Sequence, residues 1–369
     1  YLKVLKAHDL VSIQPFEGAA NKTAAIILKK GEKTQYPISY FIWSKKKGIG
    51  KIPADKLWNE VTSLFQKKKL NAKPISSSVS AWQTCSADTN ELLPIQGENY
   101  YKSQYGIETK PYGVFWIEIK QILSDKTVII TNKTEEGKLL IPKIEEKVEA
   151  DLIYPALRGS DIKRWRVVNE IYTFLTHYKN GNPIEENYFK TNFPRTYGYF
   201  TKFKTHLLNI NAKSTKRIRE QKAFYAMFGV NENIFSNYKV VWGYMGNDIS
   251  AAVVSDIKTD LNFRKLIPLY TTCFFPVDNE PEAHYLCAII NSKPVRNFIK
   301  SFSAAGRGFG TPSVMEYIGI PKFDSSNLLH RKLTEISKIC HQLKIENKEN
   351  EIEELEKEND KLMKELFRV

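Results

Sequence analysis

The order of apolar and polar positions predicts strands at the start of the chain. Residues 19–29 form a short apolar run with β-branched members, and the polar residues 29–33 that follow include a turn-forming glycine. This pattern is typical of a buried strand that enters a turn, and residues 36–43 predict the strand that returns from it. A hairpin of this kind needs further strands from elsewhere in the chain to complete its sheet.

The rest of the chain mixes strands and helices. Residues 44–52 contain three consecutive lysines and two glycines and predict a linker, whereas residues 54–69 have the apolar spacing of a helix. Further strands are predicted at residues 113–120, 127–132, 239–244 and 269–276. Further helices are predicted at residues 197–208, 283–290 with a continuation to 302, and 328–343.

The last part of the chain has a heptad pattern. Two sets of mainly apolar residues repeat with a spacing of seven: Ile345, Ile352, Asn359 and Leu366, and Leu355, Leu362 and Val369. A long terminal helix follows, either in a short coiled coil or as a single amphipathic helix lying on its own chain. We favour the single helix because Lys348 interrupts the seam and three heptads are marginal.

Length and cysteine usage set the broad class. A chain of 369 residues exceeds the roughly 100 to 200 typical of one domain, so two or three units are expected. No apolar run approaches the roughly 18 residues that a membrane-spanning helix needs. The four cysteines are scattered without CxxC pairs, which favours a reducing, cytoplasmic location over a disulfide framework.

Charge then directs attention to one segment. The chain carries a net charge of +14, and between Ala156 and Val230 fourteen Lys/Arg stand against five Asp/Glu, with fourteen aromatic residues among them. Cations neutralise phosphates and aromatic rings offer faces for bases, so this segment indicates a nucleic-acid partner. From His341 onward, nine acidic residues outnumber six basic ones, so the terminal helix is acidic.

Several catalytic signatures are missing from the sequence. A methyltransferase needs a glycine-rich cofactor loop after a strand, and an adenine amino-methylase also needs a short polar-Pro-Pro-aromatic loop; neither occurs. The six histidines lack metal-ligand spacing, and the GxSxG nucleophile pattern does not occur. No catalytic, cofactor-binding or metal-binding residue is therefore assigned.

Three local features leave alternatives open. The glycine-rich loop at residues 305–311 is either a flexible connection or a backbone approach to phosphate, with Arg307 reaching a phosphate or a guanine edge. Glu118 and Lys120 could help hold magnesium, but without an evident upstream acid an exposed strand face is favoured. Phe16 is a core residue on local grounds, or a face on which an extruded base stacks.

Three stretches taken together resemble one known family. They are residues 8–31, residues 112–119 with 152–165, and residues 283–292 with 318–321 and 355–362. The first resembles the late strands of the amino-methylating domain in type IIG restriction-modification enzymes. The second resembles the junction into the TaqI-like carboxyl-terminal specificity domain of such enzymes, and the third is similar to the closing helices of that domain.

The resemblance implies an α+β fold: terminal strands of an α/β methyltransferase sheet, a mixed α/β target-recognition domain and a long C-terminal helix. The implied division is 1–50 for the end of the methyltransferase domain, 51–150 for a connecting region and the start of the specificity domain, 151–340 for target recognition and 341–369 for the helix. The catalytic loops and the S-adenosylmethionine site would belong to an N-terminal methyltransferase portion preceding Tyr1. Phe16 would match the position whose ring stacks on a flipped adenine.

Together these observations predict sequence-specific binding of double-stranded DNA, as the target-recognition part of an adenine-specific DNA methyltransferase. The predicted contacts are Lys163, Arg164, Arg166, Lys213, Lys216, Arg217 and Arg219 to phosphates, Arg158 and Arg307 to bases, and Trp165 as an aromatic partner. Two alternatives remain: a self-sufficient nuclease or methyltransferase with an unrecognised site, and a protein-interaction adaptor acting through the terminal helix.

Overall fold

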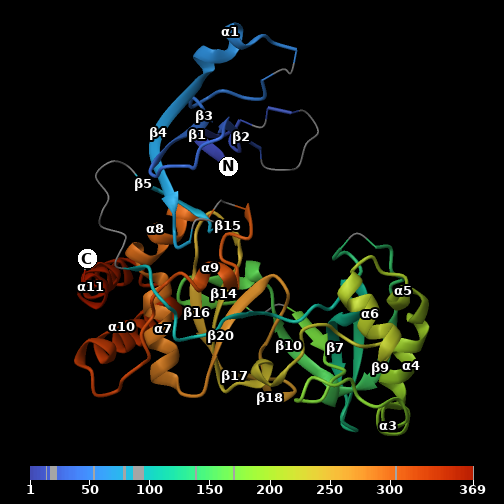
Figure 1. Ribbon diagram of the computed structural model, residues 1–369. Helices are drawn as coiled ribbons and strands as arrows, with labels where there is room; N and C mark the ends of the chain where they lie inside the picture. Colours follow the sequence, from blue (N-terminus) through green and yellow to red (C-terminus); the bar gives the residue numbers. More distant parts are fainter. Residues whose placement is uncertain are drawn as a thin grey trace. The chain divides into compact units, whose positions relative to one another are not determined.

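The computed structural model describes residues 1–13, 15–16, 23–52, 55–77, 80–85, 95–137, 139–168, 171–303 and 306–368. The chain forms two compact units. Unit 1 comprises Tyr1–Gln96 with Lys300–Ser303, and unit 2 comprises Gly97–Ile299 with Ala304–Val369. Both contain helices and β-sheets, so the fold class is α+β (Figure 1). The functional assignment of the four predicted segments stays a prediction.

Unit 1 is built on a five-stranded sheet in the order β2-β1-β3-β4-β5. Its elements are β1 (Leu2–Asp9), β2 (Ala24–Lys30), β3 (Ile38–Lys45), the short helix α1 (Trp58–Val61), β4 (Phe65–Pro74) and β5 (Trp82–Cys85). Strands β1 and β3 run parallel, and the other neighbours run antiparallel. The buried core of this sheet is small and consists of Ala7, Ile38 and Ala72 with partly buried neighbours.

Three predictions for unit 1 are wrong. Strand β2 is exposed along its whole length instead of buried, because it is an edge strand that pairs only with β1. Strands β2 and β3 are not hairpin partners, since β1 lies between them. Residues 54–69 do not form one helix, because from Phe65 onward the chain pairs with β3 in a long antiparallel ladder that overrides the helical spacing.

Unit 2 contains two larger sheets. The six-stranded sheet has the order β19-β10-β13-β7-β8-β9, and the four-stranded sheet has the order β16-β14-β20-β6. The strands of the first are β7 (Trp116–Ile122), β8 (Thr127–Asn132), β9 (Glu145–Glu149), β10 (Ile153–Leu157), β13 (Ile171–Phe174) and β19 (Ile267–Pro268). Those of the second are β6 (Gln104–Tyr105), β14 (Tyr238–Gly243), β16 (Ala251–Val254) and β20 (Thr272–Val277).

Three two-stranded ribbons complete the described strands of unit 2. They are β11 (Ile162–Lys163) with β12 (Arg166–Val167), β15 (Met245–Gly246) with β21 (Gly306–Arg307), and β17 (Asp256–Thr259) with β18 (Asn262–Lys265). The predicted strands at 127–132 and 239–244 are confirmed. The strands predicted at 113 and 269 begin later, at Trp116 and Thr272, and a turn of helix precedes the first of them.

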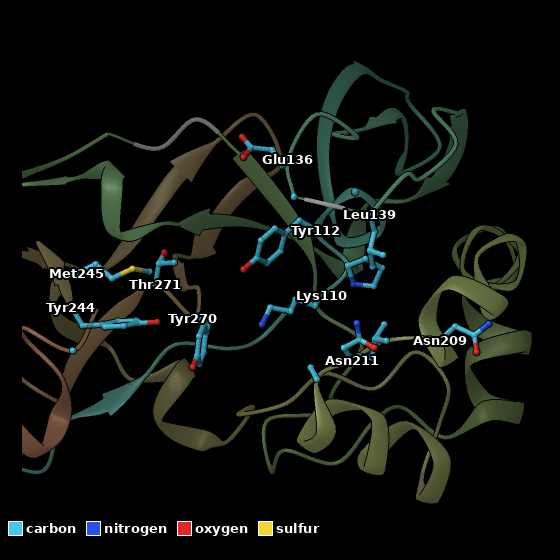
Figure 2. A pocket seen from close by; sticks show the side chains of 16 residues that line it. Lys110, Tyr112, Glu136, Leu139, Asn209, Asn211, Tyr244, Met245, Tyr270 and Thr271 are labelled. Atoms are coloured by element: carbon cyan, nitrogen blue, oxygen red, sulfur yellow. The ribbon is translucent and has the colours of Figure 1, made fainter. Parts of the chain in front are cut away.

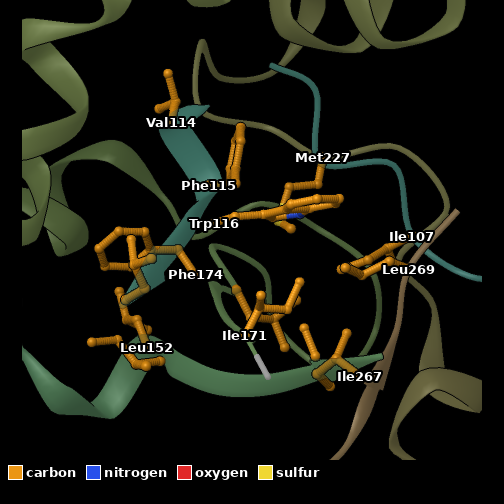
Figure 3. Packing of buried hydrophobic residues seen from close by; sticks show 14 of the residues in the cluster. Ile107, Val114, Phe115, Trp116, Leu152, Ile171, Phe174, Met227, Ile267 and Leu269 are labelled. Atoms are coloured by element: carbon orange, nitrogen blue, oxygen red, sulfur yellow. The ribbon is translucent and has the colours of Figure 1, made fainter. Parts of the chain in front are cut away.

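The largest core lies around the six-stranded sheet. Its helices are α2 (Tyr112–Phe115), α3 (Glu186–Asn192), α4 (Pro194–Lys202), α5 (Lys204–Leu208) and α6 (Lys213–Gln221). Figure 3 shows aromatic side chains such as Phe115, Trp116 and Phe174 packed among aliphatic residues of several strands. The helix predicted at 197–208 is two helices, because Phe203 leaves the helical conformation between α4 and α5.

The remaining helices accompany the four-stranded sheet. They are α7 (Glu280–Asn291), α8 (Lys293–Phe302), α9 (Pro312–Met315), α10 (Leu328–Ile345) and α11 (Glu349–Phe367). Helix α7 packs on β14, β16 and α10, and α11 packs on α10. The seam residues Ile352, Asn359 and Leu362 are buried in the chain itself, so the terminal helix is the single amphipathic helix that we favoured. None of the described helices has the length and apolar character needed to cross a membrane.

Candidate nucleic-acid interface

A cleft with a volume of about 960 Å³ opens in unit 2, lined by segments that lead into both of its larger sheets (Figure 2). The lining residues are 110–113, 136–137, 139, 209–212, 244–245, 270–271 and 308. A volume of this size is at the upper end of the range for ligand pockets. Aromatic, amide and cationic side chains meet in it, which suits a partner that is both flat and negatively charged.

Lys110 supplies the positive charge inside the cleft. Its ammonium group lies 2.6 Å from a carboxylate oxygen of Glu108, and Glu108 also accepts a hydrogen bond of 2.9 Å from the hydroxyl of Thr215 on α6. Burial disfavours the charged form of Lys110, but the hydrogen bond and the Coulomb attraction of Glu108 outweigh it and raise the pKa of Lys110. Lys110 is therefore a fixed cation at neutral pH.

Arg219 fastens α6 to this part of the cleft. Its guanidinium donates hydrogen bonds to the carbonyl oxygens of Ala226 (2.9 Å), Leu207 (2.8 Å) and Lys110 (2.6 Å). The side chain is buried, and burial lowers its pKa to about 10, so it still carries its charge at neutral pH. Arg219 was predicted as a phosphate contact, but here it has almost no exposed surface, and its donors bind the chain's own backbone.

The other three predicted cations of α6 are exposed. Lys213, Lys216 and Arg217 occupy one face of the helix, opposite the buried Thr215 and Arg219, as the helical repeat requires. Lys213 and Arg217 form no ion pair with the described residues, and Lys216 makes only a long one, of 3.9 Å, to Glu220. This face begins directly after the cleft-lining residues 209–212, so exposed cations border the cleft at this end.

Arg158 does not line the cleft itself but pairs with the lining residue Glu136, in a network of carboxylates. Its guanidinium pairs with Asp161 (2.9 Å) and with the cleft residue Glu136 (2.9 Å), and it lies 6.0 Å from the ring centre of Trp116. A base contact by Arg158 would require exchange of these partners. For Arg307 the structure describes the backbone, which pairs with Met245 beside the cleft; its side chain lies outside the described part.

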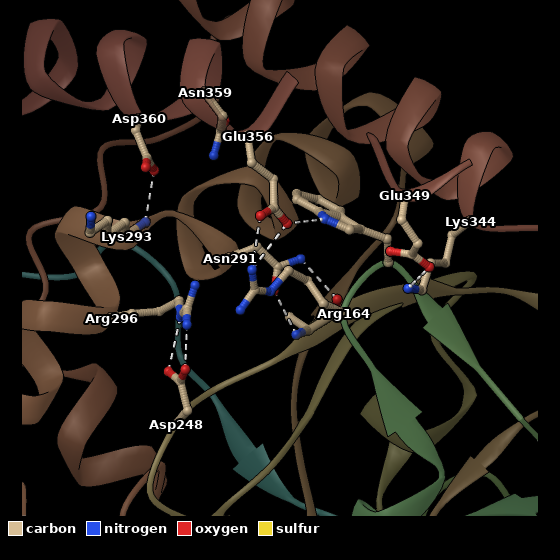
Figure 4. Close-up of polar contacts among 12 residues, drawn as sticks. Arg164, Asp248, Asn291, Lys293, Arg296, Lys344, Glu349, Glu356, Asn359 and Asp360 are labelled. Atoms are coloured by element: carbon tan, nitrogen blue, oxygen red, sulfur yellow. Dashed lines mark hydrogen bonds and ion pairs between the residues drawn. The ribbon is translucent and has the colours of Figure 1, made fainter. Parts of the chain in front are cut away.

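The basic hairpin β11–β12 packs on α10 and is bonded to α11. Its tip is anchored by Glu356 of α11, which accepts hydrogen bonds from the Arg164 guanidinium (2.9 and 3.1 Å) and from the Trp165 indole (2.8 Å), as Figure 4 shows for Arg164. Trp165 is only 1% exposed, so it offers no face to a base. Lys163 and Arg166 are opposite one another on the two strands and are exposed.

Phe16 belongs to unit 1. Its side chain is 63% exposed, so the local prediction of a core residue is wrong, whereas its role as a stacking face for a base stays a prediction. The neighbouring residues 17–22 lie outside the described part of the chain. The predicted cations thus fall into two groups within unit 2, one around the cleft and α6 and one at the hairpin beside α11.

Comparison with known proteins adds little. No protein-family model matches the chain, and no curated protein matches it in sequence. Among solved structures, the type IIG restriction endonuclease BpuSI is similar, with a TM-score of 0.34 and 12% sequence identity, over 98% of this chain and 44% of the BpuSI chain. The chain thus spans less than half of that protein. A TM-score of this size does not establish a shared fold.

Sequence reasoning missed the interior of the cleft. Lys110 and Tyr112 belong to one segment, whereas Tyr244 and Tyr270 come from two others far away in sequence, and only the fold brings the three segments together. Three sequence signals touch this place: Tyr112 begins one of the stretches that carry the family resemblance, residues 209–212 belong to the basic segment, and Gly308 belongs to the glycine-rich loop. Because no motif joins the four positions, their proximity could not be deduced from spacing.

Proposed function

We propose that this chain binds double-stranded DNA through unit 2 and acts as the target-recognition part of an adenine-specific DNA methyltransferase of the type IIG restriction-modification kind. The proposal rests on one observation: a cleft that contains the fixed cation Lys110 is bordered by a helix with three exposed cations on a single face. DNA carries one negative charge per about 1.7 Å of helix axis, so a row of exposed cations beside a cleft suits its backbone.

Different observations support the different parts of the proposed function. The cations and the cleft support nucleic-acid binding, while the restriction to adenine methylation comes from the sequence resemblance alone. S-adenosylmethionine would be bound by the N-terminal methyltransferase portion of the whole enzyme. Under this proposal the chain contributes affinity and sequence selection, and the methyl transfer is carried out by the methyltransferase portion.

The two alternatives are less well supported. Glu118 and Lys120 form an exposed ion pair of 2.8 Å, and within the described residues no group of three or more His, Cys, Asp or Glu is placed to hold a metal ion. The apolar seam of α11 is buried against its own chain, so it is not available to an external partner. Neither observation favours a nuclease or an adaptor.

The salt dependence of DNA binding tests the proposal. We expect the logarithm of the association constant to fall linearly with the logarithm of salt concentration, measured by fluorescence anisotropy with a labelled mixed-sequence duplex. The triple variant Lys213→Gln, Lys216→Gln, Arg217→Gln should lower the affinity and reduce the slope by about 0.9 for each phosphate contact that is lost.

A matched control removes the same charge elsewhere. Lys332 on α10 and Lys361 and Lys364 on α11 are exposed cations of unit 2 that do not line the cleft. The triple glutamine variant of these residues should keep the wild-type slope. A wild-type slope near zero, or equal losses in the two triple variants, would contradict DNA binding through this face.

A further inference from the structure

The cleft is lined by the aromatic ring of Tyr112, which is only partly buried. Tyr112 stacks on Trp116, with ring centres 4.2 Å apart and planes inclined by 14°. Trp116 is itself fixed, because it is buried and its indole donates a 2.7 Å hydrogen bond to Thr109. One face of Tyr112 is thus occupied, and within the described residues no aromatic ring or cation contacts the other face. Tyr112 lines the cleft as the end of a rigid stack.

The opposite wall is also aromatic. Tyr270 stacks on Tyr105 at 5.9 Å and 27°, and Tyr244 meets Tyr270 edge to face. The ammonium group of Lys110 lies 5.3 Å from the ring centre of Tyr270. Figure 2 shows Tyr112, Lys110 and Tyr270 around the same space. A ligand between these walls would meet ring faces and a cation together.

Amide groups complete the lining. Asn209 and Asn211 are exposed, and their side chains form no hydrogen bond within the described part of the chain. An amide can donate to and accept from the edge of a nucleobase. Ring faces, amides and a cation that burial does not discharge match a flat heteroaromatic group with a polar edge and a nearby phosphate.

We infer that this cleft holds a single unpaired nucleobase of the bound DNA, with the base against Tyr112 and its phosphate near Lys110. This inference rests on the proposed function, namely that the chain binds DNA. A paired base cannot occupy the site, because its neighbours in the duplex cover both of its faces, whereas an unpaired base can enter at a smaller unstacking cost. The same chemistry would also fit a free nucleotide, so the test has to separate the two sources.

Three duplexes of one sequence test the inference: one fully paired, one with a single unpaired nucleotide, and one with an abasic residue in place of that nucleotide. The abasic duplex keeps the distortion of the backbone and lacks only the base. We expect the unpaired base to raise the affinity about tenfold over the abasic duplex, the order of magnitude of one base–aromatic stack. In Tyr112→Leu the ratio of the affinities for the unpaired-base and abasic duplexes should fall to one. Tyr112→Phe keeps the ring and should keep the tenfold ratio.

Two further variants guard against a general loss of structure. Tyr270→Leu changes the opposite wall and should also reduce the ratio. Tyr188→Leu, on the exposed surface of α3, should leave it unchanged. Because each variant is judged by the ratio of two affinities measured on the same preparation, a partly unfolded sample does not imitate the expected result.

The outcomes separate the two proposals. Equal affinities for the unpaired and abasic duplexes, with normal salt-dependent binding of the paired duplex, would overturn this inference and leave the proposed function intact. Absence of binding to all three duplexes would overturn both. If a nucleoside monophosphate binds the wild type and not Tyr112→Leu while the duplex ratio stays at one, the site takes a free nucleotide, and the assignment to a base of bound DNA is wrong.

Discussion

Arg217 and Arg219 lie two positions apart on α6 and have opposite environments. Arg217 is exposed and has no ion-pair partner in the described structure, whereas Arg219 is 3% exposed and donates to three backbone carbonyl oxygens. A buried guanidinium is tolerated only when its donors are satisfied. Arg219 therefore stabilises the junction between α6 and the cleft, and Arg217 remains free for a partner.

Arg219→Met is expected to lower the free energy of unfolding by about 3 kcal/mol, because two buried carbonyl groups and one partly buried carbonyl group lose their donor. Arg217→Met should change it by less than about 0.5 kcal/mol, as is usual at exposed positions. Urea unfolding followed by circular dichroism measures both. Equal stabilities of the two variants would contradict the role of Arg219, while Arg217→Met should weaken DNA binding without loss of stability.

The sequence identified the basic segment but could not show which of its cations are free to contact DNA and which bind the chain itself. The local sequence around a cation beside a tryptophan is the same whether that cation contacts DNA or its own chain. Arg164 and Trp165 bind Glu356, which lies almost two hundred positions later, so their role depends on a tertiary contact. Helical spacing could have separated Lys213 and Arg217 from Arg219, because the position of Arg219 places it on the same face as Thr215.

At the scale of elements, α11 is hydrogen-bonded to several other segments of unit 2. Asn359 donates a 2.9 Å hydrogen bond to the carbonyl of Ala288 on α7, and the carboxylate of Asp360 accepts from the backbone of Lys293 at the start of α8 (Figure 4). Together with Glu356 these contacts tie three separate segments to one helix. Deleting residues 346–369 would expose the core of unit 2, so a deletion does not test an adaptor function cleanly.

Glu356→Ala is expected to lower the free energy of unfolding by about 2 kcal/mol, because the buried Trp165 indole and the Arg164 guanidinium lose their acceptor. Glu353→Ala is the matched control, since Glu353 is an exposed acidic residue on the same helix. Thermal and urea unfolding of the two variants provide the comparison. A loss in Glu356→Ala no larger than that in the control would show that the anchor contributes nothing.

Some elements with a buried face were predictable from their patterns, although the buried strands β10, β13 and β16 were not predicted. The strand at Tyr238–Gly243 and the helix at Leu328–Ile345 follow their apolar patterns, because burial against other elements imposes those patterns. Strand β4 has a run of lysines at its centre and is held by its pairing with β3, a backbone interaction that leaves no periodicity in the side chains. Strand β2 is likewise held by backbone pairing with β1, which is why its predicted burial is wrong.

At the scale of the whole molecule, the net charge of +14 coexists with buried histidines that stay neutral. Burial lowers the pKa of His177 and of His284 to about 3, with smaller contributions from nearby cations and from His341. His284 also forms a 3.0 Å hydrogen bond with the hydroxyl of Ser337. Both side chains lie in unit 2, which also carries the cleft, and both stay neutral in the folded chain at neutral pH.

These histidines predict that the chain loses stability in mild acid. A histidine with a folded pKa of about 3 and an unfolded pKa near 6.5 binds its proton only in the unfolded state between those values. Each such group should therefore lower the free energy of unfolding by about 1.4 kcal/mol per pH unit as the pH falls below 6.5. Urea unfolding between pH 8 and pH 5 measures this slope. Carboxylates whose pKa is lowered, such as Asp125 and Asp324, do not contribute there because they titrate below this range, whereas burial raises the pKa of Asp360. His284→Gln removes one titrating group and should reduce the slope of the free energy of unfolding against pH by about 1.4 kcal/mol per pH unit. A stability that stays constant from pH 7 to pH 5 would contradict neutral burial of these side chains.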